Sequence, residues 1–132
     1  MMQPTKALLG HKALLSVAVV YTVAITIASL APISELPKIT YEFADKWAHL
    51  LIHAALFFIW ASGFENIKGS VISWKTISYV LIGCLGYGII IEILQDVCTT
   101  YRKADVLDVV ANILGSFVGL LVFLAKRRLI TN

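Results

Sequence analysis

Apolar residues arrive in four blocks of about 20 residues, and this arrangement restricts the fold more than any other feature of the chain. A helix rises about 1.5 Å per residue, so a block of this length crosses the roughly 30 Å hydrocarbon core of a bilayer. The blocks lie at about 13–31, 45–63, 73–97 and 105–125. The sequence therefore predicts an all-α protein, a bundle of four transmembrane helices.

The composition agrees with a protein that is embedded in lipid. Of the 132 residues, 59% are apolar and only 14% are charged, which is too few charges for the surface of a soluble domain. The net charge of +3 does not indicate nucleic acid, because the basic residues form no stripe along one element. No repeat or linker divides the chain, so we predict one domain over residues 1–132, with the lipid bilayer as its partner and no nucleic acid.

Basic residues at the ends of the blocks predict how the chain is oriented in the membrane. The N-terminus, the second loop and the C-terminus contain Lys6, Lys12, Lys68, Lys75, Lys126, Arg127 and Arg128. The first loop, which contains Pro32 and Pro37, and the third loop contain fewer: Lys38, Lys46, Arg102 and Lys103. By the positive-inside rule both termini are cytoplasmic. The start of the second block, the end of the third and the start of the fourth then share the extracytoplasmic face.

Polar residues that hydrocarbon should exclude gather at that face. They recur at intervals of three or four residues, which places them along one side of each helix. The second block contributes Asp45, Lys46, His49 and His53, the third Glu92, Gln95, Thr99 and Arg102, and the fourth Asp105, Asp108 and Asn112. We expect these side chains to line one cleft that opens outward.

Small residues indicate which sides of the helices pack together. Gly115 and Gly119 form a G-x-x-x-G pair in the fourth block, and Gly88 precedes Glu92 by four residues in the third. Helices in lipid associate where glycine lets their backbones approach. If these are the packing faces, Glu92 and the polar residues before Gly115 point into the bundle.

Structural explanations compete with functional ones at several of these positions. Asp45 and Asp105 also suit helix caps or first-turn acids that complement the helix dipole. Asp108 and Asn112 could serve only as hydrogen-bonding groups between helices. Glu92 lies well inside its block, where an acid favours a buried partner or a function.

Metal binding and nucleophilic catalysis have weaker support. His49, His53, Glu92 and Asp108 are zinc-ligand types, but the glutamate of an H-E-x-x-H motif is absent, so we predict no metal and no cofactor. No serine lies in a G-x-S-x-G turn, and Cys98 has no evident histidine partner. Glu92 and His49 remain candidates for a catalytic acid–base pair.

Taken together, the motifs resemble those of the VanZ-like family of small bacterial membrane proteins. The matching pattern is D-K-x-x-H at 45–49, E-x-x-Q at 92–95, Arg102, Asp105, Asp108, Asn112, and G-x-x-x-G at 115–119. The resemblance implies a multi-pass protein of the bacterial cytoplasmic membrane. It also implies a link to low-level resistance to the glycopeptide teicoplanin, with which a founding member is associated. It supplies no mechanism.

Three functions are consistent with the sequence. In the first, the cleft binds an amphiphilic envelope molecule, a lipid-linked wall precursor or a lipid head group; Arg102 or Lys46 meets phosphate, and Glu92, Gln95 and Asn112 fix its orientation. In the second, the chain is an enzyme that acts on an envelope lipid with Glu92 and His49. In the third, the polar residues only hold the helices together. The sequence predicts no oligomeric state.

Overall fold

The computed structural model describes residues 4–32 and 43–131, without the side chains of residues 4–9 and 11. Four α-helices make up most of this part: α1 (Pro4–Leu30), α2 (Ala44–Lys68), α3 (Trp74–Cys98) and α4 (Val106–Thr131). No strand occurs among the described residues, so the predicted all-α fold with four helices is confirmed. Pro37 and Lys38 of the first loop and the side chain of Lys6 lie outside the described residues.

All four helices have the length and surface of membrane spans. Each contains 25 to 27 residues, or about 38 Å of helix, which exceeds the thickness of the hydrocarbon core. Each includes a segment long and apolar enough to cross a membrane. Large apolar side chains such as Val20, Ile82 and Leu121 are about two-thirds exposed on the outside of the bundle. An apolar exterior of this kind is suited to lipid.

Three of the helices extend beyond the blocks that hydrophobicity marked, whereas α3 matches its block to within one residue at each end. α1 begins at Pro4, nine residues before the predicted start. α2 continues five residues past the predicted end, through Glu65 and Asn66, and stops at Gly69. Gly69 has a left-handed backbone (φ 63°), and its N–H donates to the carbonyls of Asn66 and Glu65. α4 likewise continues past residue 125 to Thr131. Hydrophobicity ends where the hydrocarbon ends, whereas a helix ends where its backbone is capped.

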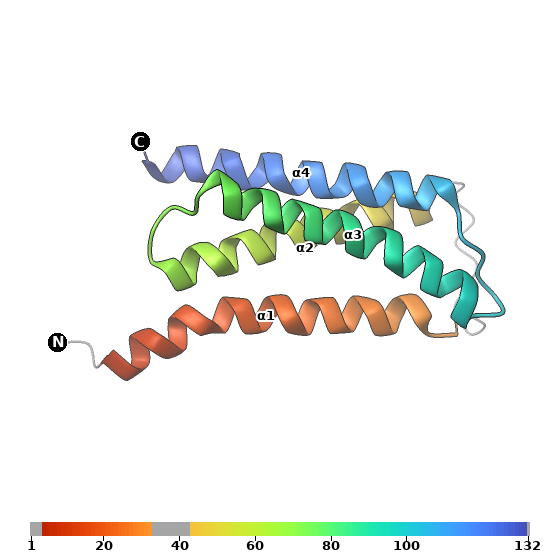
Figure 1. The fold of residues 1–132 in the computed structure, drawn as a ribbon, viewed down its shortest axis with the longest axis horizontal. Helices are drawn as coiled ribbons and strands as arrows, with labels where there is room; N and C mark the ends of the chain where they lie inside the picture. The colour runs from red at the N-terminus through yellow and green to blue at the C-terminus, as the bar shows by residue number, and fades with distance from the viewer. Residues whose placement is uncertain (1–3, 33–42, 132) are drawn as a thin grey trace.

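Consecutive helices run antiparallel, so both termini lie at one end of the bundle (Figure 1). We call this the terminal end, and the opposite end, where α2 and α4 begin, the polar end. α2 contacts each of the other helices and forms its most extensive interface with α4. α1 packs mainly on α2, contacts α3 only slightly, and makes no contact with α4 among the described residues.

Glycines allow the close approach of α4 to α2. A Cβ atom on Gly115 would overlap the carbonyl oxygen of Leu50, and one on Gly119 would overlap that of Ala54. On α3, a Cβ on Gly88 would lie 3.0 Å from the Cβ of Asn112. The G-x-x-x-G pair therefore lies against the backbone of α2, in the turns of α4 that follow Asn112.

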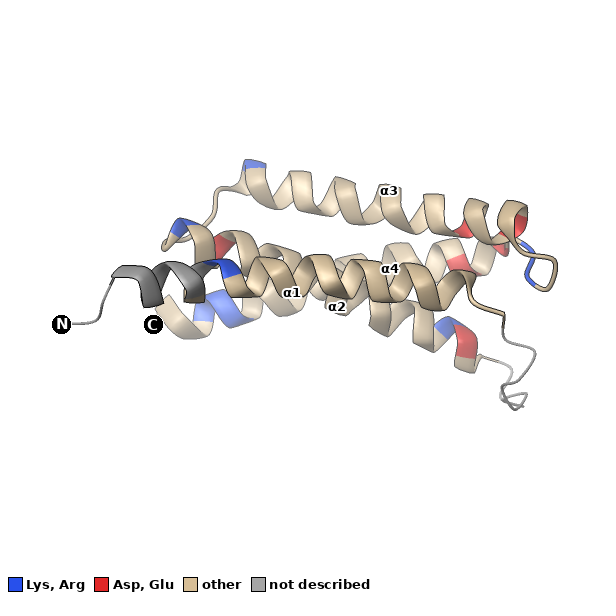
Figure 2. Cartoon of the chain, turned by 90° about the horizontal axis from the view of Figure 1, so that it is seen from below, with Lys and Arg blue, Asp and Glu red and all other residues tan. Residues whose placement is uncertain are grey.

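The interior of the bundle changes character along its length. From the middle toward the terminal end it is apolar, with Leu56, Phe57 and Phe123 almost fully buried. Toward the polar end the buried side chains are instead Glu92, Asn112 and other polar groups. Figure 2 shows most of the acidic residues at the polar end and most of the basic residues at the terminal end. The bundle is therefore apolar on its outer surface, and its interior is most polar toward the polar end.

The glycine contact gives a test of how the bundle is held together. Gly115→Ala should lower the free energy of unfolding by about 1–3 kcal/mol, because the new Cβ must push against the backbone of α2. Thermal unfolding in detergent measures the effect. Gly86→Ala is the matched control, since no atom lies within 4 Å of a Cβ added there. Equal melting temperatures for the two variants would contradict this packing.

Candidate functional site

The polar end brings together side chains from α2, α3, α4 and the connection between α3 and α4. Asp45, Lys46 and His49 begin α2, while Glu92 lies six residues before the end of α3. We call the whole group the polar cluster; its members are Asp45, Lys46, His49, Glu92, Arg102, Asp105, Asp108 and Asn112.

Lys46 links α2 to the beginning of α4. Its ammonium donates to Asp105 Oδ2 at 2.6 Å and also to Asp108 Oδ1. Its side chain is 22% exposed and that of Asp108 is 9% exposed, so water screens this pair less than a surface ion pair. Lys46 is therefore held between two carboxylates of the neighbouring helix.

Asp105 has two roles in the structure. Its Oδ1 accepts a hydrogen bond from the Leu107 N–H at 2.9 Å, which caps α4, while Oδ2 accepts from Lys46. The bond from the Lys46 ammonium holds the pKa of Asp105 below its ordinary value of 3.8, and the Leu107 amide lowers that pKa further. Capping and ion pairing, which the sequence left as alternatives, coexist at this residue.

Arg102 also has an acidic partner. Its Nη2 lies 3.2 Å from Asp45 Oδ1, and the Asp45 side chain is half-exposed. Both cations expected to meet a phosphate thus already contact carboxylates. Lys46 bonds to two carboxylates and lies 3.8 Å from a third, that of Asp45, whereas Arg102 contacts one. The Arg102 side chain is 25% exposed and has further N–H groups.

His49 lies at the centre of the polar cluster. Its Nδ1–H donates to Asn112 Oδ1 at 3.0 Å and lies 3.5 Å from Glu92 Oε1. Its Nε2 lies 3.7 Å from Asp45 Oδ1 and 3.9 Å from Asp108 Oδ2. The imidazole therefore contacts groups on all three of the helices that carry the motif.

Beneath His49, Asn112 and Glu92 connect α4 to α3. The Asn112 amide donates to the Gly88 carbonyl at 3.2 Å and to Glu92 Oε1 at 3.4 Å. Glu92 is 1% exposed and lies about 9 Å of helix from the end of α3. Its Oε2 has no hydrogen-bond partner among the described residues. An unpaired carboxylate oxygen at this depth is costly, and it is an acceptor available to a bound donor.

Gln95 and Thr99 do not belong to the polar cluster. The Gln95 amide donates to the Ser29 carbonyl of α1 at 3.0 Å, and the Thr99 hydroxyl donates to the Gln95 carbonyl at 2.5 Å. Three helical residues turn the side-chain direction by roughly 300°, so Gln95 lies about 60° around α3 from Glu92. This offset lets the Gln95 amide reach α1, even though both residues belong to the E-x-x-Q motif.

A cavity of about 150 Å³ lies beside the polar cluster, between α1, α2 and α3. We call it the polar cleft. Asp45, His49 and Arg102 line its polar part, and the His53 and Tyr87 rings, 5.8 Å apart, line its deeper part. Nothing in the motifs indicated Tyr87, nor that α1 would provide one wall.

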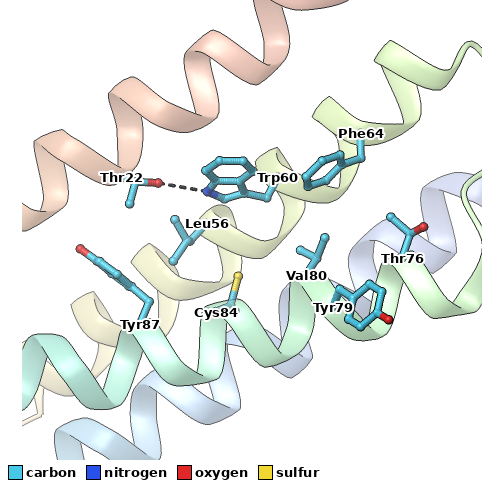
Figure 3. Close-up of a pocket in the computed structure, with 10 residues that line it drawn as sticks. Thr22, Leu56, Trp60, Phe64, Thr76, Tyr79, Val80, Cys84 and Tyr87 are labelled. Carbon is cyan, nitrogen blue, oxygen red and sulfur yellow. Dashed lines mark hydrogen bonds between the residues drawn. The ribbon is translucent and has the colours of Figure 1, made fainter.

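A second cavity, the apolar groove, continues from Tyr87 toward the terminal end (Figure 3). Its volume is about 420 Å³, and its walls include Leu56 and Trp60 of α2 and Gly83 of α3. Several polar groups around it are paired: Trp60 Nε1 donates to the Thr22 hydroxyl at 3.0 Å (Figure 3), and the Tyr87 hydroxyl is 2.8 Å from that of Thr26. The groove therefore presents a mostly apolar surface to an occupant.

The arrangement of acids gives little support to a metal site. Asp45, His49 and Asp108 each place one ligand atom within 4.8 Å of the others. The ammonium of Lys46, however, lies 3.8 Å from Asp45 and bonds to Asp108. A metal ion bound there would be repelled by this resident cation. His53, which the sequence grouped with the candidate ligands, is not in this set.

The ion pair at Asp105 predicts a dependence of stability on pH. Asp105→Asn retains an oxygen that can cap α4 and removes only the charge. Because the pKa of Asp105 is lowered by folding, the charge stabilises the protein above about pH 3.8, and this stabilisation disappears as the pH falls through the lowered pKa. Melting temperatures of wild type and variant should differ at neutral pH and converge in acid.

Asp96→Asn serves as the control, since Asp96 accepts from the Ala104 N–H and makes no ion pair among the described residues. If the melting temperatures of wild type and Asp105→Asn still differ in strong acid, the stabilisation does not come from the charge of Asp105.

Comparison with known proteins gives one match. A protein-family model described as VanZ/LLP1 matches residues 9–128, a range that includes every residue of the polar cluster. No curated protein and no solved structure gave a match.

Proposed function

This chain belongs to the VanZ/LLP1 family, and we propose that it is a multi-pass protein of the bacterial cytoplasmic membrane that binds an amphiphilic molecule of the cell envelope. The observation that carries the proposal is Glu92 Oε2, a buried acceptor without a partner among the described residues, on a carboxylate that lies 3.5 Å from His49, which lines the polar cleft. Residues 1–132 act as one domain in this proposal. The bound molecule spans the polar cleft and the apolar groove.

Both termini face the cytoplasm in this proposal, and the polar end faces outward. Support comes from the basic residues at the terminal end, which the positive-inside rule assigns to the cytoplasm. Cys98 is exposed at the polar end, so a membrane-impermeant maleimide applied to intact spheroplasts should label it. Labelling of Cys98 only after lysis would reverse the orientation.

The charges of the polar cluster suggest the chemistry of the head group. Four carboxylates face the cations Lys46 and Arg102, with His49 between them. A head group with hydroxyl, amide or amine donors would satisfy Asp45 and Glu92 Oε2, and the free N–H groups of Arg102 would meet a phosphate. A lipid-linked wall precursor combines these groups. Lys46 bonds to Asp105 and Asp108, and Asn112 bonds to His49, Glu92 and the Gly88 carbonyl. These four residues support the site by fixing α4 against α2 and α3.

The hydrophobic part of the ligand would occupy the apolar groove. The groove lies within the range of about 300–1,000 Å³ that is typical of small-molecule sites, whereas the polar cleft is smaller and leaves part of the head group in water. Tyr87 lines both cavities. From His49 to Phe64 is about 22 Å of helix, more than one leaflet of about 15 Å. This reach favours a chain longer than an ordinary leaflet lipid, such as a polyisoprenoid.

Filling the groove tests the proposal. Gly83→Leu should reduce retention of undecaprenyl phosphate by about tenfold in native mass spectrometry, because the new side chain occupies space that the hydrocarbon needs. Geranyl phosphate, which is too short to reach past Tyr87, should be retained weakly and equally by both proteins. Teicoplanin susceptibility of a host that expresses the chain gives a cellular readout: wild type should raise the inhibitory concentration, and Gly83→Leu should not.

Gly86→Leu is the matched control. Neither glycine has an atom within 4 Å of an added Cβ, but only Gly83 lines the groove. If both variants retain undecaprenyl phosphate as wild type does, the hydrocarbon chain does not bind in the groove.

Catalysis is a second candidate function, favoured by the 3.5 Å distance between His49 Nδ1 and Glu92 Oε1. In this case the pair would move a proton on a head group held in the polar cleft. Glu92→Gln should then keep the melting temperature and ligand retention but abolish conversion of the bound lipid, followed by chromatography of extracted lipids. Unchanged lipid after incubation with the wild-type protein would exclude turnover of the lipids tested and leave the binding function.

A further inference from the structure

The terminal end contains a third cavity, far from the polar cluster and lined by different residues. Its volume is about 350 Å³, and it lies between the end of α2, the start of the α2–α3 connection and the end of α4, with Leu14 of α1 in its wall. Its polar lining includes Ser62, Glu65, Asn66, Ser70, Lys126, Arg127 and Thr131. In the sequence, the basic run Lys126–Arg128, which follows the fourth hydrophobic block, indicated only how the chain is oriented in the membrane.

Two polar atoms at this cavity are buried and have no hydrogen-bond partner among the described residues. Ser62 is 5% exposed, and its hydroxyl makes no hydrogen bond. The Nη1 group of Arg127 is also buried and makes none. Ser62 lies six residues before the end of α2, about 9 Å into the helix, and its low exposure shields this hydroxyl from bulk water. Unsatisfied donors of this kind are costly and point to a missing acceptor.

The local charge also favours an anion. Lys126 donates to Glu65 Oε2 at 3.2 Å, so these two charges compensate each other. Arg127 has no ion pair with a carboxylate among the described residues and therefore leaves a net positive charge at the cavity. The planar guanidinium offers paired N–H groups that match two oxygens of a phosphate.

From these contacts we propose that the cavity at the terminal end binds a phosphate group, held by Arg127 and the Ser62 hydroxyl with Lys126 beside it. At the membrane interface the phosphate of an anionic lipid is the first source, because the cavity lies where α2 and α4 leave the hydrocarbon. A free phosphate ester is the other source. The site is independent of the polar cleft, since the two share no residue.

Native mass spectrometry of the purified full-length protein with phosphatidylglycerol tests the lipid source. Arg127→Gln should reduce retained phosphatidylglycerol by about tenfold, which corresponds to the loss of a charge-assisted contact. Arg128→Gln makes the same change of charge at an exposed neighbour and should alter retention less than about twofold. Wild type should retain phosphatidylcholine less than phosphatidylglycerol, since the choline cation offsets the charge of its phosphate and is repelled by the positive charge at the cavity.

Ser62→Ala provides a second variant in case the Arg127 change impairs folding. It removes one donor in an apolar setting and should reduce phosphatidylglycerol retention by about threefold. Equal retention by Arg127→Gln, Arg128→Gln and Ser62→Ala would overturn the proposal. Glycerol 3-phosphate tests the other source: if it raises the melting temperature of wild type but not of Arg127→Gln, and phosphatidylglycerol does not bind, the occupant is a free phosphate ester.

The test of this cavity is independent of the test of the polar cleft and the apolar groove. Gly83→Leu does not contact this cavity and should retain phosphatidylglycerol as wild type does. Loss of undecaprenyl phosphate binding alone would therefore test the proposed function, and loss of phosphatidylglycerol alone would test this site.

Discussion

The close contact of α4 with the backbone of α2 is the interaction on which the polar end depends. Because Gly115 lies against the carbonyl of Leu50, the residues just before each of them are brought together: Asn112 meets His49, and Asp108 meets Lys46. A side chain at Gly115 would separate these pairs. A packing requirement in the middle of two helices thus determines the geometry of charged groups more than one turn away.

Within the polar cluster, groups whose hydrogen bonds are made within the protein differ from a group that has no partner among the described residues. Lys46 and Asn112 donate hydrogen bonds to other groups of the protein. These bonds stabilise the contacts between helices, because no water in the hydrocarbon core could replace them. Glu92 Oε2 has no such partner. A buried acceptor that the protein leaves unpaired raises the energy of the empty state, and a ligand that donates to it recovers part of that energy. This contrast is the physical basis for separating the supporting residues from the binding residues.

The loose packing of α1 on α3 has a consequence for access. α1 rests mainly on α2, so a groove remains between α1 and α3 that continues the polar cleft past Tyr87. An amphiphile can have its head group in water and its chain in hydrocarbon only if its site extends across both environments. The terminal end differs, since the polar groups there lie in a separate cavity with an unpaired cation. The two ends are therefore suited to different ligands.

The number of helices, their lengths to within about one or two turns, and the set of polar residues at one end could be predicted from the sequence, because hydrophobic blocks and three-to-four-residue spacing follow from helix geometry and lipid alone. Which side chains form hydrogen bonds with one another could not be predicted from the sequence. Spacing placed Gln95 beside Glu92, but its amide reaches Ser29 of α1, and the contacts of Lys46 and Arg102 with carboxylates could not be read from the spacing. Rotation of one helix about its axis exchanges such partners without altering any pattern along the chain. Only the packing of four helices in three dimensions decides which donors are used within the protein and which cavities remain between them.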